Sequence, residues 1–342
     1  MARKENLLMS LLSVWGIMLV VLGHSGFEEP IIMNKLYYLH KWIYSFHMPL
    51  FFMISGYLFS YTNENFTGID AKEFLKKKFL RLLVPYFVLG IVIFLIKYAF
   101  SSLSHATREF SISNFFMMFI APTGQNSTMG FLWYVFTLFV IFSVVIILGK
   151  LKLDLKRVGV CFALIVLFWA IFILMPSTSL FNWSTVCKDL PYFIIGILYK
   201  RYEPGLSRFF NQQSLLKLAV FTTLSLAFAC IKLPISGWIT SILSSICGLL
   251  MSISLCSCLL KSSFTNNYII PLSKYTYSIY LLSWFGQYAA KVIFVNILNC
   301  NWLVVVIAMF IAGIILPLVV CFTVEKVECL SKQRWLRLVI GL

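Results

Sequence analysis

Charged side chains are scarce in this sequence. Aspartate, glutamate, lysine and arginine make up 12% of its 342 residues, whereas soluble globular proteins carry about 25%. The shortage excludes an ordinary soluble domain. Acidic residues are scarcer than basic ones. The chain has 12 acidic and 28 basic residues, which gives it a formal charge of +16. The basic residues lie between apolar segments rather than on one polar face among aromatic residues, so nucleic acid is not expected as a partner.

Cysteine and histidine patterns typical of metal sites are also lacking. The nine cysteines form no CxxC pair and no cluster with histidine, so no metal is expected. Most of them lie inside apolar stretches, where cysteine behaves as a small apolar residue. Cys187 and Cys300 are the exceptions, because both fall in predicted outer loops. The sequence does not decide whether these two form a disulfide.

Long apolar runs are what the sequence has in quantity. Apolar residues make up 61% of the chain, and uncharged stretches of about 20 residues, long enough to cross a bilayer core as helices, recur along it. No stretch alternates apolar and polar residues as membrane strands do. We therefore predict an all-α, polytopic integral membrane protein. Its longest loops, near 63–81 and 101–130, are too short for an independent domain, so residues 1–342 are expected to form a single transmembrane domain.

Ten apolar segments can be marked along the chain. The first is expected to remain as a signal-anchor helix, because Gly23-His24-Ser25-Gly26 is a poor cleavage site. The sixth is short and is expected to begin earlier or to be tilted. The segments are roughly 7–23, 43–62, 82–100, 131–149, 158–175, 190–199, 217–231, 238–260, 275–298 and 302–324.

The basic residues indicate the orientation. With the N-terminus inside, the inner segments hold 21 of the 28 basic residues and the outer segments five, while Lys97 and Lys291 fall inside predicted helices. Lysine and arginine are in excess on the cytoplasmic side of membrane proteins. The sequence therefore predicts about ten transmembrane helices, with both termini in the cytoplasm.

Two histidines near the outer membrane face are candidates for chemistry, because polar groups in membranes are rare. His24 ends the first helix, where a neutral imidazole can act as a general base near pH 7. The alternative is a histidine in the headgroup region, bonded to a backbone carbonyl. His47 lies at similar depth, at the outer start of the second helix. Pro49 is expected in the first turn of that helix, and Ser55-Gly56 is expected to let another helix approach closely.

A basic amphipathic stretch leads into the third helix. It carries Lys76, Lys77, Lys78 and Arg81. One interpretation is attraction to anionic lipid, worth about 1 kcal/mol per basic residue. The other is a cytosolic dock for a phosphorylated cofactor such as a nucleotide, since lysine and arginine bind phosphate well.

An ordered series of motifs resembles the acyltransferase-3 family of bacterial membrane acyltransferases, and most of all its fucose 4-O-acetylase-like branch. The series covers nearly the whole chain, and the family also has ten helices. The matching motifs are GIMLVVLGH at 16–24, FHMPLFF at 46–52, ISGYLF at 54–59, RLLVPY at 81–86, LWYVFTLF at 132–139, LPYFIIGIL at 190–198 and YSIYLL at 277–282.

The resemblance implies O-acyl transfer in a bacterial inner membrane. The donor is usually acetyl-CoA, and the acceptor is a hydroxyl of an envelope glycan such as O-antigen, capsule or exopolysaccharide, presented free or as a lipid-linked sugar. The histidine that ends helix one is essential in such enzymes, which makes His24 the expected catalytic residue, with His47 as its helper. The basic residues Lys76, Lys77, Lys78 and Arg81 match the stretch associated with the CoA phosphates.

Two positions depart from the family pattern. Ser13 stands where a basic residue is usual, eleven residues before the histidine, and Ser283 stands where many members have a histidine. They motivate one competing hypothesis, a non-catalytic relative that acts as a membrane sensor or binding module. Another is a glycolipid or polysaccharide transporter, although no repeat typical of transporters is evident.

Two routes for the acyl group stay open. The predicted inner dock and His24 lie on opposite membrane faces, separated by roughly a core thickness of 30 Å. Either the pantetheine arm reaches a sugar hydroxyl that His24 deprotonates, or a side chain is acetylated first and passes the group on.

Overall fold

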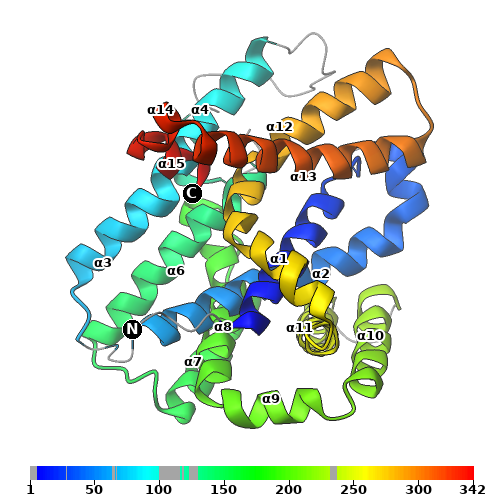
Figure 1. Ribbon diagram of the computed structural model, residues 1–342. Coiled ribbons are helices and arrows are strands. Elements are labelled where there is room, and N and C mark those ends of the chain that lie inside the picture. The colour runs from blue at the N-terminus through cyan, green and yellow to red at the C-terminus, as the bar shows by residue number, and fades with distance from the viewer. Residues whose placement is uncertain are drawn as a thin grey trace. The chain divides into compact units, whose positions relative to one another are not determined.

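The described part of the protein is helical throughout. The structure, a computed structural model, describes residues 6–27, 29–63, 66, 68–99, 116–117, 119–122, 130–231 and 237–342, and the long loop predicted at 101–130 lies almost entirely outside them. Within these ranges every regular element is a helix (Figure 1), as predicted from the hydropathy. The helices are α1 (Leu7–Gly23), α2 (Pro30–Thr62), α3 (Ala71–Lys78), α4 (Val84–Ala99), α6 (Trp133–Lys150), α7 (Val158–Leu174), α8 (Trp183–Arg201), α9 (Glu203–Asn211), α10 (Ser214–Cys230), α11 (Gly237–Leu259), α12 (Thr276–Lys291), α13 (Trp302–Lys326), α14 (Glu328–Ser331) and α15 (Arg334–Ile340).

Each of the ten predicted apolar segments falls on a helix. Four helical stretches of the described chain are long and apolar enough to cross a membrane: Ala71–Ile96, Trp133–Lys150, Gly237–Leu259 and Trp302–Lys326. A fifth candidate is the pair α9 and α10, which meet at 95°. The protein therefore has the helices of a multi-pass membrane protein.

The chain folds into two compact units. The first comprises Met1–Ser55, Tyr199–Lys326 and Leu342, and the second comprises Gly56–Leu198 and Val327–Gly341. Helices α2 and α8 contribute residues to both. The nine cysteines are all free thiols, including Cys187 and Cys300.

Helix α2 begins earlier than the apolar pattern predicted. Its first residue is Pro30, where the fixed φ of proline suits a helix start, and it is kinked at Leu36. The interpretation of Pro49 as a first-turn residue is therefore wrong, because this proline lies deep inside the helix. Proline has no N–H to offer the carbonyl of Ser45 one turn earlier. The hydroxyl of Ser245 in α11 lies within hydrogen-bonding distance of that carbonyl and also of Ser241 O in its own helix.

Serine hydroxyls join α2, α10 and α11 in the first unit. Trp42 Nε1 of α2 donates to Ser225 Oγ of α10 at 3.0 Å. Ser225 and Ser244 each donate a hydroxyl to the other's carbonyl oxygen, and Ser45 Oγ lies 2.8 Å from Ser244 Oγ. Small hydroxyl residues let apolar helices approach closely and bond across the contact. These bonds hold the middle of α2 against the α10–α11 pair (Figure 1).

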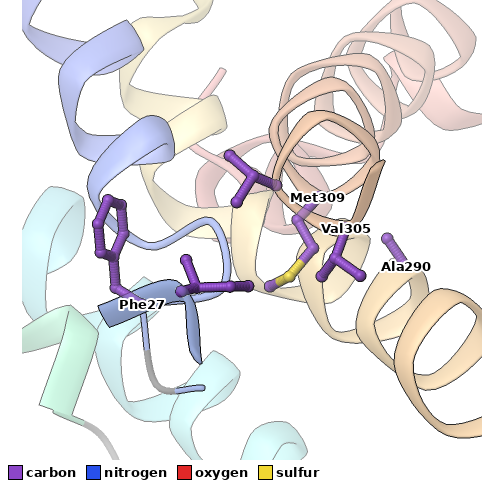
Figure 2. Close-up of a cluster of buried hydrophobic side chains, with 6 residues drawn as sticks. Phe27, Ala290, Val305 and Met309 are labelled. Carbon is purple, nitrogen blue, oxygen red and sulfur yellow. The ribbon is translucent and has the colours of Figure 1, made fainter. Parts of the chain in front are cut away.

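An apolar cluster lies just beyond the end of α1. Figure 2 shows Phe27 from the segment after α1, Ala290 from α12, and Val305 and Met309 from α13. Ile32 of α2 and Val306 of α13 complete it. The cluster therefore ties the turn after α1 to both α12 and α13.

The turn between α9 and α10 is closed by a lysine. Gln213 adopts a left-handed conformation with φ of 47°. Lys217 Nζ donates to the carbonyls of Phe209 and Gln212 at the end of α9. A cation is favourable where a helix leaves carbonyls unpaired, so Lys217 stabilises the sharp bend.

Aromatic rings form the centre of the second unit. Phe59 of α2, Phe142 of α6 and Phe193 of α8 lie with their ring centroids between 5.5 and 6.0 Å apart, the range that aromatic pairs prefer. Gly56 of α2 packs directly on the carbonyl of Phe193. The expected close helix approach at Ser55-Gly56 is confirmed at Gly56.

Helix α8 begins at Trp183, before the predicted segment 190–199, so the prediction of an earlier start is correct. The residue before it, Asn182, donates its side-chain amide to Thr137 Oγ1 of α6 at 2.9 Å, and both residues are fully buried. A buried amide without a partner would be costly. The bond fixes the start of α8 on α6.

Gly56→Ala is expected to destabilise the protein by about 1–3 kcal/mol, because a Cβ there would overlap the carbonyl oxygen of Phe193. Gly159→Ala on α7 is the matched control in the same unit, since a Cβ at Gly159 meets nothing within 4 Å. The measurement is thermal unfolding of the purified protein in detergent. Equal unfolding temperatures for the two variants would contradict the close contact between α2 and α8.

Candidate active site

Three of the chain's four histidines meet in the first unit, around the ring of Tyr44. They are His24 at the end of α1 and His40 and His47 on α2, while the fourth, His105, lies outside the described residues. The structure thus brings together the two histidines that the sequence selected. Across the described ranges, no three His, Cys, Asp or Glu side chains are grouped as metal ligands.

His24 is the exposed member of the group. It follows the last residue of α1, and its N–H still bonds back to Val20 O at 3.1 Å. Its Nδ1 atom lies 3.3 Å from the hydroxyl oxygen of Tyr44. The same hydroxyl donates to Gly23 O at 3.2 Å. The imidazole therefore contacts Tyr44 through Nδ1 at the surface of the unit.

His47 is buried, with 2% of its surface exposed. Its Nδ1–H donates to the carbonyl of Ile43 at 2.8 Å, because a carbonyl oxygen can only accept. The edge of its ring meets Tyr44, with centroids 4.8 Å apart. His47 therefore contacts the site through Tyr44.

His40 and Tyr44 are site residues that sequence analysis did not select. The His40 ring contacts two aromatic rings in tilted geometry, with centroid distances of 4.6 Å to Phe27 and 3.9 Å to Tyr44. Burial lowers the pKa of His40, so the ring is neutral near pH 7. A usable signal existed, because residues 40, 44 and 47 share one face of a helix. It was missed because residues 30–42 were assigned to a loop.

A buried polar network holds the end of α1 from the side of α12. Gln287 is 4% exposed, and its Nε2 donates to Val21 O at 2.8 Å and to Ser25 Oγ at 3.2 Å. Ser25 Oγ in turn donates to Val21 O at 2.7 Å. The residues on both sides of His24 are thus fixed by bonds that are shielded from water.

An ion pair lies one turn further along α12, at its last residue. Lys291 Nζ is 2.8 Å from Glu29 Oε1, and the two side chains are 24% and 30% exposed. Lys291 was predicted to fall inside a membrane segment, where an unpaired charge is costly. Lys291 is thus paired with Glu29, which directly precedes α2, and the pair joins α12 to the start of α2.

The basic stretch before the third predicted helix belongs to the second unit. Helix α3 is capped by Asp70, whose side chain accepts from two backbone N–H groups, and it continues into a π-helical segment, Phe79–Leu83. Lys76 and Arg81 are exposed. Lys77 is exposed and pairs with Glu73 at 2.5 Å.

Lys78 differs from the other three basic residues because it is half-buried. Its ammonium nitrogen lies 4.2 Å from the ring centroid of Phe142 and 5.2 Å from that of Phe74. A cation over an aromatic face is attracted by the ring. Lys78 thus fastens α3 to α6.

The two positions that depart from the family pattern are occupied by hydroxyl groups inside helices. Ser13 Oγ donates to Ser10 O of its own helix at 2.7 Å. Ser283 is buried in α12, one turn before Gln287 and on the same helical face. At this face the polar group that reaches the end of α1 is the amide of Gln287.

Gln287→Met is expected to lower the free energy of unfolding by about 1–3 kcal/mol, because Val21 O and Ser25 Oγ lose a buried donor. Gln212→Met is the matched control, since the Gln212 side chain is exposed and surface changes are usually within about 0.5 kcal/mol. Thermal unfolding in detergent measures both. A Gln287 variant as stable as the control would refute the anchoring role.

An exposed imidazole that contacts Tyr44 through one nitrogen and follows a helix end supported by a buried network can take a proton from a bound hydroxyl near neutral pH. The acyltransferase-3 family model, described as an acyltransferase domain, matches residues 9–325, a range that includes His24, His47 and the basic stretch. No curated protein and no solved structure matches the chain. The resemblance inferred from the motifs is confirmed at the level of the family: the chain belongs to the acyltransferase-3 family of membrane acyltransferases.

Proposed function

We propose that the protein transfers an acetyl group from cytosolic acetyl-CoA to a hydroxyl of a cell-envelope glycan, as the fucose 4-O-acetylase-like branch of the family does. The observation that carries the proposal is the exposed imidazole of His24, fixed at the end of α1 by Tyr44. Membership of an acyltransferase family supports acyl transfer as the reaction class. An imidazole is the usual general base for activating a hydroxyl near pH 7.

In the proposed reaction His24 takes the proton of the acceptor hydroxyl. The hydroxyl oxygen then bonds to the carbonyl carbon of the thioester, and collapse of the tetrahedral intermediate breaks the carbon–sulfur bond. The imidazolium returns the proton to the departing CoA thiolate. The products are an O-acetyl ester and free CoA, so His24 ends the cycle in its starting state.

His47 is assigned a supporting role in the same reaction. It is buried, and it meets the ring of Tyr44, which in turn contacts His24. The hydrogen bond to Ile43 O keeps its Nδ1 protonated when the ring is neutral. His47 therefore supports the position of Tyr44 and, through it, that of His24.

We assign the CoA phosphates to the basic stretch of the second unit. Lys76, Lys77 and Arg81 are exposed there, and Lys78, packed over Phe142, is the least accessible of the four. Phosphate groups form strong charge-assisted hydrogen bonds with lysine and arginine. No metal is required for this transfer, since the thioester is already an activated acyl donor.

We further propose ten membrane crossings with both termini in the cytoplasm of a bacterial inner membrane. Each predicted apolar segment lies on a helix, and most basic residues lie on the side assigned to the cytoplasm. This orientation gives the basic stretch access to cytosolic acetyl-CoA. It also leaves the end of α1 on the outer side, where envelope glycans or lipid-linked sugars are presented.

His24→Ala is expected to lower kcat for acetyl transfer by about 10²–10⁴-fold, because no base remains to take the acceptor proton. The protein should still reach the membrane, since the His24 side chain is exposed. The assay follows label from acetyl-CoA into a lipid-linked glycan extract. Lys35→Ala, an exposed position on α2, is the control. Near-normal activity of His24→Ala would remove His24 from the mechanism.

The double charge reversal Lys76→Glu/Arg81→Glu is expected to raise KM for acetyl-CoA about tenfold or more, with kcat little changed, because two phosphate contacts are lost. Lys152→Glu/Lys156→Glu is a matched control with the same charge change at exposed positions of the second unit. If the Lys76→Glu/Arg81→Glu variant has the same KM for acetyl-CoA as the control, and its membrane binding depends less on anionic lipid, the stretch serves in lipid anchoring.

A further inference from the structure

Helix α10 presents an apolar side to its surroundings from its first turn onward. Leu216, Val220 and Leu224 follow one another at intervals of four residues, so they share one face of the helix, and all three are exposed. Leu215, in the same first turn, is 73% exposed. In a membrane protein, an exposed apolar helix face of this kind contacts lipid. The hydrocarbon layer therefore reaches the first turn of α10, next to the end of α9.

Helix α9 runs along this layer rather than through it. It meets α10 at 95° (Figure 1), so it lies close to the membrane plane when α10 crosses. Lysines fix the corner between the two helices. Lys217 of α10 donates to the carbonyls of Phe209 and Gln212. Lys261, which follows α11, donates to Ser214 Oγ at the start of α10, at 3.2 Å. The direction of α9 is therefore set within the first unit.

One side of α9 packs against the first unit, and another side is polar. Phe210 is 2% exposed, and Glu203 pairs with Lys200 at 2.6 Å. Arg208 and Asn211, which are exposed, lie three residues apart and so share a different side of the helix. A charged side chain inside the hydrocarbon is costly. The composition of α9 therefore suits the boundary of the membrane rather than its interior.

Between these two sides α9 has an exposed aromatic edge. Tyr202, which caps the helix, and Phe209 are seven residues apart and so lie on the same side, and they are 47% and 48% exposed. A cation lies close to each ring. Arg201 Cζ is 5.7 Å from the ring centroid of Tyr202, and Lys217 Nζ is 3.9 Å from that of Phe209. Because Lys217 belongs to the first turn of α10, the Phe209 ring lies on the side toward which α10 runs. Exposed aromatic rings beside basic groups are typical of helices in the membrane interface.

We propose that α9 is an interfacial helix, which lies in the headgroup layer of the cytoplasmic leaflet. Tyr202 and Phe209 are turned to the acyl chains. Arg201 and Arg208, both exposed, contact the phosphates of anionic lipids. Charge complementarity favours this occupant, because the one acidic residue of α9, Glu203, is already in an ion pair. The choice of leaflet rests on the proposed membrane orientation, whereas the position in the interface does not.

The depth of α9 is tested with a fluorescent amino acid incorporated at Phe209 or, as the matched control, at Asn211 on the polar side of the same turn. Full-length protein is reconstituted in vesicles that are captured through a C-terminal tag. One quencher is a nitroxide near the top of the acyl chains, and the other is iodide in the external water. We expect the nitroxide to quench the Phe209 probe at least about twofold more than the Asn211 probe, and iodide to show the reverse order, because interfacial helices bury their apolar side about 5–10 Å. Both side chains are exposed, and thermal unfolding checks that both variants fold as the wild type does.

The contact with headgroups is tested in vesicles with and without phosphatidylglycerol. Nitroxide quenching of the Phe209 probe should fall at least about twofold when the anionic lipid is omitted, because basic residues are attracted to anionic lipid. Arg201→Gln/Arg208→Gln should remove this dependence. Lys152→Gln/Lys156→Gln, which removes two charges at exposed positions of the second unit, should keep it. A dependence that the arginine variant leaves unchanged overturns the assignment of these arginines to lipid phosphates.

The other outcomes separate this inference from the proposed orientation. Equal quenching of both probes by the nitroxide would place α9 inside the hydrocarbon, and equal quenching by iodide would place it in water. A Phe209 probe that neither quencher reaches would be covered by protein. Each of these results overturns the interfacial helix. Nitroxide quenching as expected at Phe209, with an Asn211 probe that external iodide does not reach, would instead support the interfacial helix and reject the orientation that puts α9 and the C-terminus on one side.

Discussion

The end of α1 is the constraint on which the rest of the candidate site depends. A carbonyl without a donor costs several kcal/mol in apolar surroundings, so the last turn of this helix requires partners from other elements. Gln287 of α12 and Tyr44 of α2 supply them from two sides. The end of α1, which His24 directly follows, is thus bonded to both α2 and α12.

The positions of the apolar helices could be predicted well from the sequence. The helices coincide with the apolar segments because about 20 uncharged residues in lipid have helix as their main option. The segment before His47 was mistaken for a loop, since it contains polar residues such as Asn34, Lys35 and Lys41. Hydropathy measures transfer into lipid, not helix formation, and the N-terminal part of α2 is a helix with a polar face. Tyr44 and His40 were missed with it.

The role of Pro49 shows a second limit of reading a sequence alone. A proline near the start of an apolar run is typical of a first helical turn, yet α2 continues through it. The carbonyl that proline leaves without its helical donor is reached by the hydroxyl of Ser245, which is distant in sequence. Compensation of this kind depends on tertiary contacts between α2 and α11. The same holds for Gln287, whose partners lie on a helix at the other end of the chain.

Two polar regions in a chain with few charges carry the proposed chemistry. In the proposed reaction the base comes from the histidine cluster of the first unit, and the cations that we assign to phosphate come from the basic stretch of the second unit. At Ser13, where the family usually has a basic residue, the hydroxyl bonds within its own helix.

The proposed reaction can be measured as O-acyl transfer by the purified wild-type protein in lipid vesicles. Radiolabelled acetyl-CoA is supplied together with a lipid-linked glycan extract. The account predicts label in the glycan that mild alkali releases as acetate, the behaviour of an O-ester, with one free CoA formed for each acetyl transferred. A protein that neither transfers nor hydrolyses acetyl-CoA, and does not bind it, would contradict the account.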